Sequence, residues 1–232
     1  MYKLDNTALQ IAIVANVSAA LAEDVASGDI NALLIPESQT AFAKIITRQD
    51  AVLCGTAWVD EAFRQIDPSV ELRWYFNDGD SLKADDLIVE VTGPARSLLT
   101  GERTALNFLQ LMSAVATRTR YFVNKVDGNP MELIDTRKTI PGLRLAQKYA
   151  VTCGGGQNHR MGLYDAFLIK ENHIAACGGI DQAVQAARAL APNKLIEVET
   201  ETLEELEQAL QSGTDIIMLD NFSLEDTKKA VE

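Results

Sequence analysis

The sequence contains few of the residues that cross-link chains or hold metals. It has three cysteines and two histidines among 232 residues. Cys54, Cys153 and Cys177 are unevenly spaced and form no CxxC pair. Such spacing indicates neither a disulfide framework nor a thiolate metal site. We therefore interpret the three cysteines as free thiols of the core or of loops.

Long apolar runs are also missing. No apolar stretch approaches the roughly 20 residues that a membrane-spanning helix needs, and residues 1–21 are typical of an amphipathic helix. An apolar content of 47% is sufficient for one large core or two smaller ones. The composition thus predicts a folded protein with no membrane segment, and a cytoplasmic location is the default expectation.

Charge is distributed unevenly along the chain. The formal net charge is −12, yet residues 96–170 hold eleven Lys or Arg and five Asp or Glu, whereas the rest of the chain holds ten and twenty-eight. A nucleic-acid-binding protein usually shows an extended basic face. A basic segment within an acidic chain instead indicates a local pocket for a small acidic ligand, so we expect no nucleic-acid partner.

The first half of the chain has short β-rich runs separated by turn residues. Between residues 38 and 92 these runs predict antiparallel strands, interrupted by a helix over Thr56–Gln65. A long helix is then predicted to begin near Thr100, because apolar residues from Leu106 to Ala116 recur on one helical face. We interpret this helix as the hinge between two halves of the protein.

The second half repeats a strand followed by a helix. Each of the segments ELIDTRK, DAFLIK, KLIEVE and DIIMLD is followed by a helical pattern, so four β/α units in series predict parallel strands. Local signals support the helices. Pro141 suits a first helical turn, Thr202 and Glu205 have the spacing of a capping box, and Gly213 suits a helix end.

Charged residues stand at the carboxyl ends of these predicted strands. In barrels of β/α units, the strand ends and the loops that follow them build the site. Strand alternation puts Glu197 and Glu199 on the face that points away from the helices. Buried acids are costly unless cations, a metal or ligand hydroxyls satisfy them, and Lys170 and Arg137 are the expected partners. The charged strand-end residues are Arg137, Lys138, Lys170, Glu199 and Asp220.

The segment Asp135–His173 concentrates groups that suit a multiply charged anion. Its triple glycine, Gly154–Gly156, provides either a tight turn with positive φ or close approach to a ligand, and both roles are compatible. His159 is either a ligand-binding residue or a structural hydrogen-bonding residue, and we do not assign His173. The cations at the end of the long helix are interpreted as a solvated face: Arg118, Arg120 and Lys125.

Several long motifs resemble one known family. DTRKT-PGLR, KYAV-CGGG-NHR-GL-D, IKENH, EVE, IIMLDN and the GERTALNFLQ helix are similar to the quinolinate phosphoribosyltransferases, and the resemblance covers essentially the whole chain. It implies an α+β N-terminal sandwich domain followed by an α/β barrel-type domain, with parallel strands that are fewer than eight and incomplete in this chain. We place the first domain, with the hinge helix, at residues 1–112 and the second, carrying the active site, at 113–232.

The resemblance also implies a reaction. Such enzymes convert quinolinate and phosphoribosyl pyrophosphate, with Mg²⁺, into nicotinate mononucleotide, pyrophosphate and CO₂ in NAD biosynthesis. The protein is therefore expected to be a pentosyltransferase with Mg²⁺ as its cofactor. The resemblance further implies a homodimer with active sites shared between subunits, in which Arg103 reaches the site of the partner.

Eight residues occupy motif positions that the family uses. Quinolinate carries two adjacent carboxylates, which arginine binds bidentately where lysine cannot. Phosphates need further cations, and carboxylates suit ribose hydroxyls and a metal, directly or through water. The implied substrate-binding residues are Arg103, Arg137, Lys138, His159, Arg160, Lys170, Glu199 and Asp220. The implied catalytic residues are Lys138, Lys170, Glu199 and Asp220, and the implied metal ligands are Glu199 and Asp220.

The chain departs from the family where it stops. It ends at Glu232 after four predicted β/α units, whereas the family continues for roughly fifty or more residues with further strands and phosphate-binding loops. Two alternatives therefore stand beside the expected activity. One is a truncated, non-catalytic binding or dimerisation fragment, and the other is a relative that uses a different pyridine or anionic acceptor, such as nicotinate. Three arginines favour an acceptor with two carboxylates.

Overall fold

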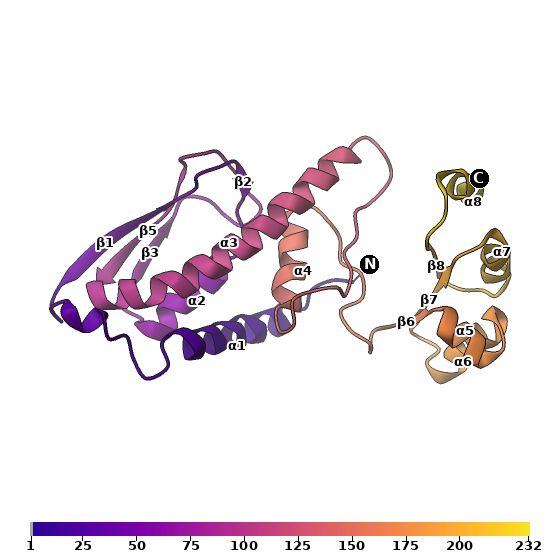
Figure 1. Ribbon diagram of the computed structural model, residues 1–232, viewed down its shortest axis with the longest axis horizontal. Helices are drawn as coiled ribbons and strands as arrows, with labels where there is room; N and C mark the ends of the chain where they lie inside the picture. The colour runs from indigo at the N-terminus through magenta and orange to yellow at the C-terminus, as the bar shows by residue number, and fades with distance from the viewer. Residues whose placement is uncertain (1) are drawn as a thin grey trace. The chain divides into compact units, whose positions relative to one another are not determined.

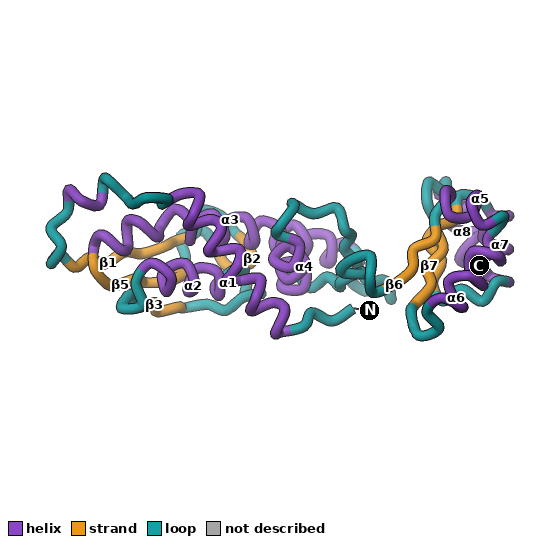
Figure 2. The backbone as a smooth tube through the Cα atoms, turned by 90° about the horizontal axis from the view of Figure 1, so that it is seen from below, coloured by secondary structure: helices purple, strands orange, loops and turns teal. Residues whose placement is uncertain are grey.

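Figures 1 and 2 show the computed structural model, which describes residues 2–232. The chain divides into two compact units, Met1–His159 and Arg160–Glu232. The predicted domain boundary between residues 112 and 113 falls inside a helix of the first unit, and this boundary stays a prediction. Within residues 2–232, no helix is long and apolar enough to cross a membrane.

The first unit combines antiparallel strands with longer helices. Its helices are α1 (Asn6–Asp24), the 3₁₀ helix η1 (Ala32–Leu34), α2 (Thr56–Ile66), α3 (Ala95–Lys125) and α4 (Arg144–Cys153). Its strands are β1 (Thr40–Ile46), β2 (Ala51–Val52), β3 (Glu71–Trp74), β4 (Ser81–Leu82) and β5 (Leu87–Pro94). The predicted antiparallel strands and the predicted helix over Thr56–Gln65 are confirmed.

Strand β5 is the central strand of the larger sheet. It pairs antiparallel with β1 on one side and with β3 on the other, so that Val91 lies opposite Ala43 and Leu72. Successive side chains of a strand point to opposite faces, and Val89 and Val91 on one face of β5 are buried in the core. Strands β2 and β4 form a separate antiparallel pair.

Helix α3 is the central helix of the first unit. Figure 1 shows it running along the larger sheet, and it contacts α1, α2 and α4. Its buried stripe includes Leu109, Met112 and Ala116, which recur at helical spacing. The helix begins at Ala95 rather than near Thr100, directly after Pro94, which is the last residue of β5 and the N-cap of the helix.

The second unit consists of a parallel sheet covered on one side by helices. Its strands β6 (Ala166–Ile169), β7 (Leu195–Thr200) and β8 (Ile216–Leu219) are parallel and lie in the order β6-β7-β8. Its helices are α5 (Glu171–Cys177), α6 (Ile180–Leu190), α7 (Leu203–Gln211) and α8 (Leu224–Val231). Both views show these helices on one side of the sheet.

The strand alternation predicted for the second unit is confirmed. Ile196 and Val198 of β7 are fully buried in a cluster with Val184 of α6 and Ala209 of α7. Since successive side chains alternate, Glu199 lies on the face of β7 that these helices do not cover. Helix α7 begins as predicted, because the Thr202 Oγ1 accepts a hydrogen bond from the Glu205 amide at 3.1 Å.

Two predictions about the segment before α4 are wrong. Residues 132–138 form no strand and make only one isolated parallel bridge, between Ile134 and Gln157. Polar groups of this segment bond instead to the loop that follows α4. Helix α4 begins at Arg144 and not at Pro141, because Pro141 and Gly142 form a turn in which Gly142 has a φ of +81°, outside the helical region.

Candidate active site

A buried lysine organises the two site segments of the first unit. Lys148 of α4 is 1% exposed, and its Nζ forms an ion pair with the Asp135 carboxylate and donates a hydrogen bond to the His159 carbonyl at 3.0 Å. Asp135 also accepts from the His159 amide at 2.8 Å and from the Asn158 side chain at 2.7 Å. Asn158 donates in addition to the Lys148 carbonyl at 3.0 Å.

This network joins the segment that carries Arg137 and Lys138 to the segment that carries His159. Backbone hydrogen bonds reinforce the link, from the Asp135 amide to the Gln157 carbonyl at 3.0 Å and from the Gln157 amide to Leu133 at 2.8 Å. Reasoning from the sequence missed Lys148, because no local pattern separates it from the exposed lysines of other helices. Three of the predicted site residues thus stand on two loops that one buried ion pair holds together.

Arg137 and Lys138 lie in the loop before α4. The Arg144 side chain of α4 donates to Thr139 Oγ1 at 3.2 Å and to the Arg137 carbonyl at 3.5 Å, which fixes the loop backbone. The Arg137 Nε is buried and has no hydrogen-bond partner, a state that costs about 1–3 kcal/mol for a buried donor. The Lys138 side chain is exposed. Both residues therefore have cationic groups available for a ligand.

Arg103 stands apart from these loops in the chain. Because α3 begins at Ala95, Arg103 lies in the third turn of the helix and not in the first turn that the predicted start near Thr100 would give. Its side chain is exposed and makes no hydrogen bond or ion pair with residues 2–232. A free guanidinium on a helix surface is available to a ligand or to another chain.

The triple glycine allows α4 and its following turn to approach α3 closely. A Cβ atom at Gly154 would lie 2.5 Å from the Ala116 carbonyl oxygen, and one at Gly156 would lie 2.9 Å from Thr119 Cγ2. Gly155 has a φ of +91°, which favours glycine. The tight turn with positive φ is confirmed, and helix packing explains the two flanking glycines.

The second unit brings three predicted site residues to one edge of its sheet. Lys170 follows β6, Glu199 lies near the end of β7, and Asp220 follows β8. The Lys170 Nζ donates to Glu199 Oε2 at 2.6 Å, and Glu199 is buried. Lys170 and Arg137 were expected to pair with the acids of β7. The pairing of Lys170 is confirmed, and that of Arg137, which lies in the other unit, stays a prediction.

The remaining site residue of the second unit is Arg160. Its side chain is 8% exposed, and its Nη1 donates to the Ala166 carbonyl at 3.4 Å, at the start of β6. Asp220 is half-buried and accepts from the Asn221 side chain at 2.9 Å. The predicted residues are thus divided between the units: Arg103, Arg137, Lys138 and His159 lie in the first, and Arg160, Lys170, Glu199 and Asp220 in the second.

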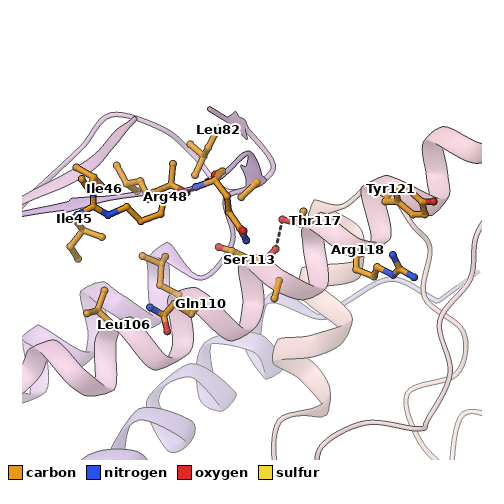
Figure 3. A pocket seen from close by; sticks show the side chains of 16 residues that line it. Ile45, Ile46, Arg48, Leu82, Leu106, Gln110, Ser113, Thr117, Arg118 and Tyr121 are labelled. Atoms are coloured by element: carbon orange, nitrogen blue, oxygen red, sulfur yellow. Dashed lines mark hydrogen bonds between the residues drawn. The ribbon is translucent and has the colours of Figure 1, made fainter. Parts of the chain in front are cut away.

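A separate cavity of about 640 Å³ in the first unit contains none of the predicted site residues. Figure 3 shows it between the end of β1, the β4 strand and the exposed side of α3, lined by Ile46, Leu82 and Gln110, with Arg48 and Arg118 at its margin. A hydrogen bond of 2.6 Å from Thr117 Oγ1 to the Ser113 carbonyl lies within α3 at this surface. Its lining is largely apolar, so it does not match the anionic ligand that the basic segment suits.

Comparison with known families is decisive. The model of the quinolinate phosphoribosyl transferase N-terminal domain matches residues 24–113, and that of the C-terminal domain matches residues 115–232. The chain belongs to the quinolinate phosphoribosyltransferase family. The resemblance seen in the sequence motifs is therefore confirmed, together with a two-domain fold that contains a parallel sheet.

Individual relatives agree with this family. The chain is 45% identical over 200 residues to a probable nicotinate-nucleotide pyrophosphorylase (carboxylating) of Bacillus subtilis, which covers 86% of this chain and 69% of the relative. A protein of the same description from Synechocystis is 40% identical over 213 residues, 91% of this chain and 72% of the relative. The solved nicotinate-nucleotide pyrophosphorylase of Francisella tularensis is 48% identical with a TM-score of 0.94, over 99% of this chain and 80% of that chain.

Proposed function

We propose that this quinolinate phosphoribosyltransferase family member transfers the phosphoribosyl group of phosphoribosyl pyrophosphate to quinolinate and releases pyrophosphate and CO₂. The product is nicotinate mononucleotide, for NAD biosynthesis. The observation that carries this proposal is the match of both family domains to one chain, over residues 24–113 and 115–232. The charges at the candidate site support it.

The proposed acceptor site is built from arginines. Arg103, Arg137 and Arg160 would bind the two carboxylates of quinolinate, because planar guanidinium groups pair bidentately with carboxylates. The buried Nε of Arg137, which lacks a partner, supports an anionic ligand at this residue, since an acceptor there would satisfy it.

The proposed donor site combines cations for phosphate with carboxylates for the ribose. Lys138, His159 and Lys170 would neutralise phosphate charge, while Glu199 and Asp220 would contact ribose hydroxyls. As pyrophosphate leaves the anomeric carbon, positive charge develops on the ribose. Fixed carboxylates favour that state over the ground state. The 2.6 Å ion pair between Lys170 and Glu199 supports their action at one place.

The reaction itself needs two steps, a displacement at the anomeric carbon and a decarboxylation of the ring. The pyridine nitrogen donates its electron pair to the anomeric carbon while the bond from that carbon to the pyrophosphate oxygen breaks. The pyridinium ring then withdraws electrons, so the bond to the adjacent carboxylate breaks and CO₂ leaves. The electron pair of the broken carbon–carbon bond stays on the ring carbon, which then takes a proton from water. The protein's arginines and lysines position both reactants for the first step.

The carboxylates at the strand ends fit a divalent cation. Glu199 lies near the end of β7 and Asp220 follows the neighbouring strand β8. Carboxylate oxygens are the donors that Mg²⁺ prefers, with few protein ligands when a pyrophosphate supplies the others. We propose that these two residues hold Mg²⁺ directly or through water. The cation would neutralise negative charge on the leaving group.

The oligomeric state is proposed from the family to which the chain belongs. We infer a homodimer with shared sites, in which the exposed Arg103 of one subunit completes the site of the other. We also infer that the three parallel strands belong to an incomplete barrel with fewer than eight strands. A cytoplasmic location stays a prediction.

Acceptor competition tests the proposed function. The full chain is incubated with phosphoribosyl pyrophosphate, Mg²⁺ and either quinolinate or nicotinate, and nicotinate mononucleotide and CO₂ are measured. If three arginines bind the two carboxylates of quinolinate as proposed, nicotinate, which has one carboxylate, should be a very poor substrate. Comparable kcat/KM values for the two acceptors would remove the proposed specificity. Absence of product from both, despite a folded chain, would remove the activity.

A further inference from the structure

A group of soft and hard metal ligands lies in the first unit, and none of its residues is assigned to the reaction. The sulfur atoms of Cys54 and Cys153 and a carboxylate oxygen of Asp78 all lie within 4.8 Å of one another. Cys54 follows β2, Asp78 lies in the turn before β4, and Cys153 is the last residue of α4. Three segments that are distant in the sequence therefore converge on one point.

The backbone holds these side chains in place. The Cys54 amide donates to Ser113 Oγ at 3.0 Å, and the Ser113 hydroxyl donates to the Cys54 carbonyl at 3.2 Å, which anchors this loop to α3. Arg120 of α3 donates to the Cys153 carbonyl at 3.2 Å and to the Gly154 carbonyl at 2.9 Å. Arg120 is thus half-buried and structural, and its predicted place on a solvated face is wrong.

The carboxylate of the group is oriented by several hydrogen bonds. Asp78 Oδ1 accepts from the Gly55 and Thr56 amides, at 3.0 and 3.1 Å, and Oδ2 accepts from the Tyr149 hydroxyl at 2.9 Å. A carboxylate has about four lone pairs, so these bonds leave it able to coordinate an ion. Hydrogen bonds of this kind orient the ligands of known metal sites.

The sulfur atoms of Cys54 and Cys153 lie within 4.8 Å of each other. Cys54 is fully buried, whereas Cys153 and Asp78 are half-buried and give a route from solvent. No assigned step of the proposed reaction uses either cysteine.

We propose that Cys54, Asp78 and Cys153 form a structural site for a thiophilic divalent cation of the Zn²⁺ class. Two sulfurs and one carboxylate oxygen are ligands that Zn²⁺ takes in tetrahedral geometry, with the Tyr149 hydroxyl or a water in the fourth position. Ligands of one tetrahedral ion lie about 3.3–3.8 Å apart, so closing this group on an ion needs side-chain shifts of about 1 Å. The bound ion would tie α4 to the β2 and β4 loops and stabilise the first unit.

Metal titration of the full chain tests the site without substrates. The protein is prepared with a reductant and freed of metals, and Zn²⁺ is titrated against a chromophoric chelator. Co²⁺ serves as a second probe, because thiolate coordination gives it a charge-transfer absorption. We expect one equivalent of Zn²⁺ per chain and a rise in Tm with Zn²⁺ concentration.

Matched variants assign the ligands. Cys54→Ser and Cys153→Ser should each weaken Zn²⁺ binding by at least about 100-fold, since each removes one of only two sulfur ligands. Cys177→Ser, which changes the exposed third cysteine of the other unit, should leave binding unchanged. Asp78→Asn gives a second test should a cysteine variant fail to fold, as judged by circular dichroism, and should weaken binding about 10-fold or more.

Two outcomes would overturn the proposal. One is Zn²⁺ binding that is equal in the native chain, Cys153→Ser and Asp78→Asn. The other is an absence of stoichiometric binding by the reduced chain, including the case in which Cys54 and Cys153 form a disulfide on oxidation and bind no metal once reduced. Because the assay contains no quinolinate or phosphoribosyl pyrophosphate, either result leaves the proposed reaction untouched.

Discussion

In the second unit three of the four site residues stand at the ends of regular strands, whereas in the first unit the site residues stand on loops and on a helix surface. Lys170, Glu199 and Asp220 owe their positions to the pairing of three parallel strands. Arg137 and Lys138 owe theirs to a buried ion pair between Asp135 and Lys148. Backbone ladders tolerate single side-chain changes, because their hydrogen bonds do not involve side chains. A loop whose side-chain hydrogen bonds converge on one buried charge pair should be more sensitive to such changes.

The largest expected effect is the loss of the buried lysine. Lys148→Met leaves the Asp135 carboxylate buried without its cation, and breaking such a pair costs about 3–5 kcal/mol. Both tryptophans, Trp58 and Trp74, lie in the first unit, so denaturant unfolding followed by tryptophan fluorescence reports on that unit. Lys228→Met, on the exposed face of α8, is the control. A change below about 1 kcal/mol would mean that the loops do not depend on this pair.

Lys138 offers the opposite case, a lysine of the first unit whose side chain is exposed. Lys138→Ala should lower kcat/KM about 10²-fold or more, near 2.7 kcal/mol of transition-state stabilisation, with little change in Tm. Lys125→Ala, an exposed lysine of α3, should retain activity. A large fall in Tm with activity preserved would show that Lys138 acts in folding.

Mixing two variant subunits tests whether Arg103 of the first unit contributes to the active site of its own chain or to that of the partner subunit. Arg103→Ala and Arg137→Ala variants, each inactive alone, are mixed and allowed to exchange. With random exchange, half the dimers are mixed and each has one intact site of two, so activity should recover to about a quarter of the unmodified level. If native mass spectrometry detects mixed dimers and activity stays absent, Arg103 serves its own subunit or has only a structural role.

The smallest effect is expected where the second unit depends on a local signal. Thr202→Ala removes the hydroxyl that caps α7 at 3.1 Å and should cost about 1 kcal/mol. Hydrogen exchange of the α7 amides measures this loss, and Glu207→Gln on the exposed side of α7 is the control. Equal hydrogen-exchange rates of the α7 amides in Thr202→Ala and Glu207→Gln would mean that tertiary packing alone determines where this helix begins.

The sequence predicted the second unit better than the first. The strands β6, β7 and β8, the cap at Thr202 and the pairing of Lys170 with an acid of β7 all follow from period and spacing within short segments. Residues 132–138 have an apolar pattern similar to a strand, yet they form a loop, because Asp135 bonds to Lys148, Asn158 and the His159 amide. Local propensity contains no information about such a competing partner.

The sequence by itself determined the family, through long motifs, and the order of the regular elements, through hydrophobic period and caps. Only the tertiary structure decided that Lys148 is buried, that Arg120 binds backbone carbonyls, and that Cys54, Asp78 and Cys153 meet. Uneven cysteine spacing had indicated no metal site. The separation of residues along the sequence predicts contacts only within a helix, a strand or a short loop. Cys54, Asp78 and Cys153 come together because α4 packs against α3 and brings distant segments to one place.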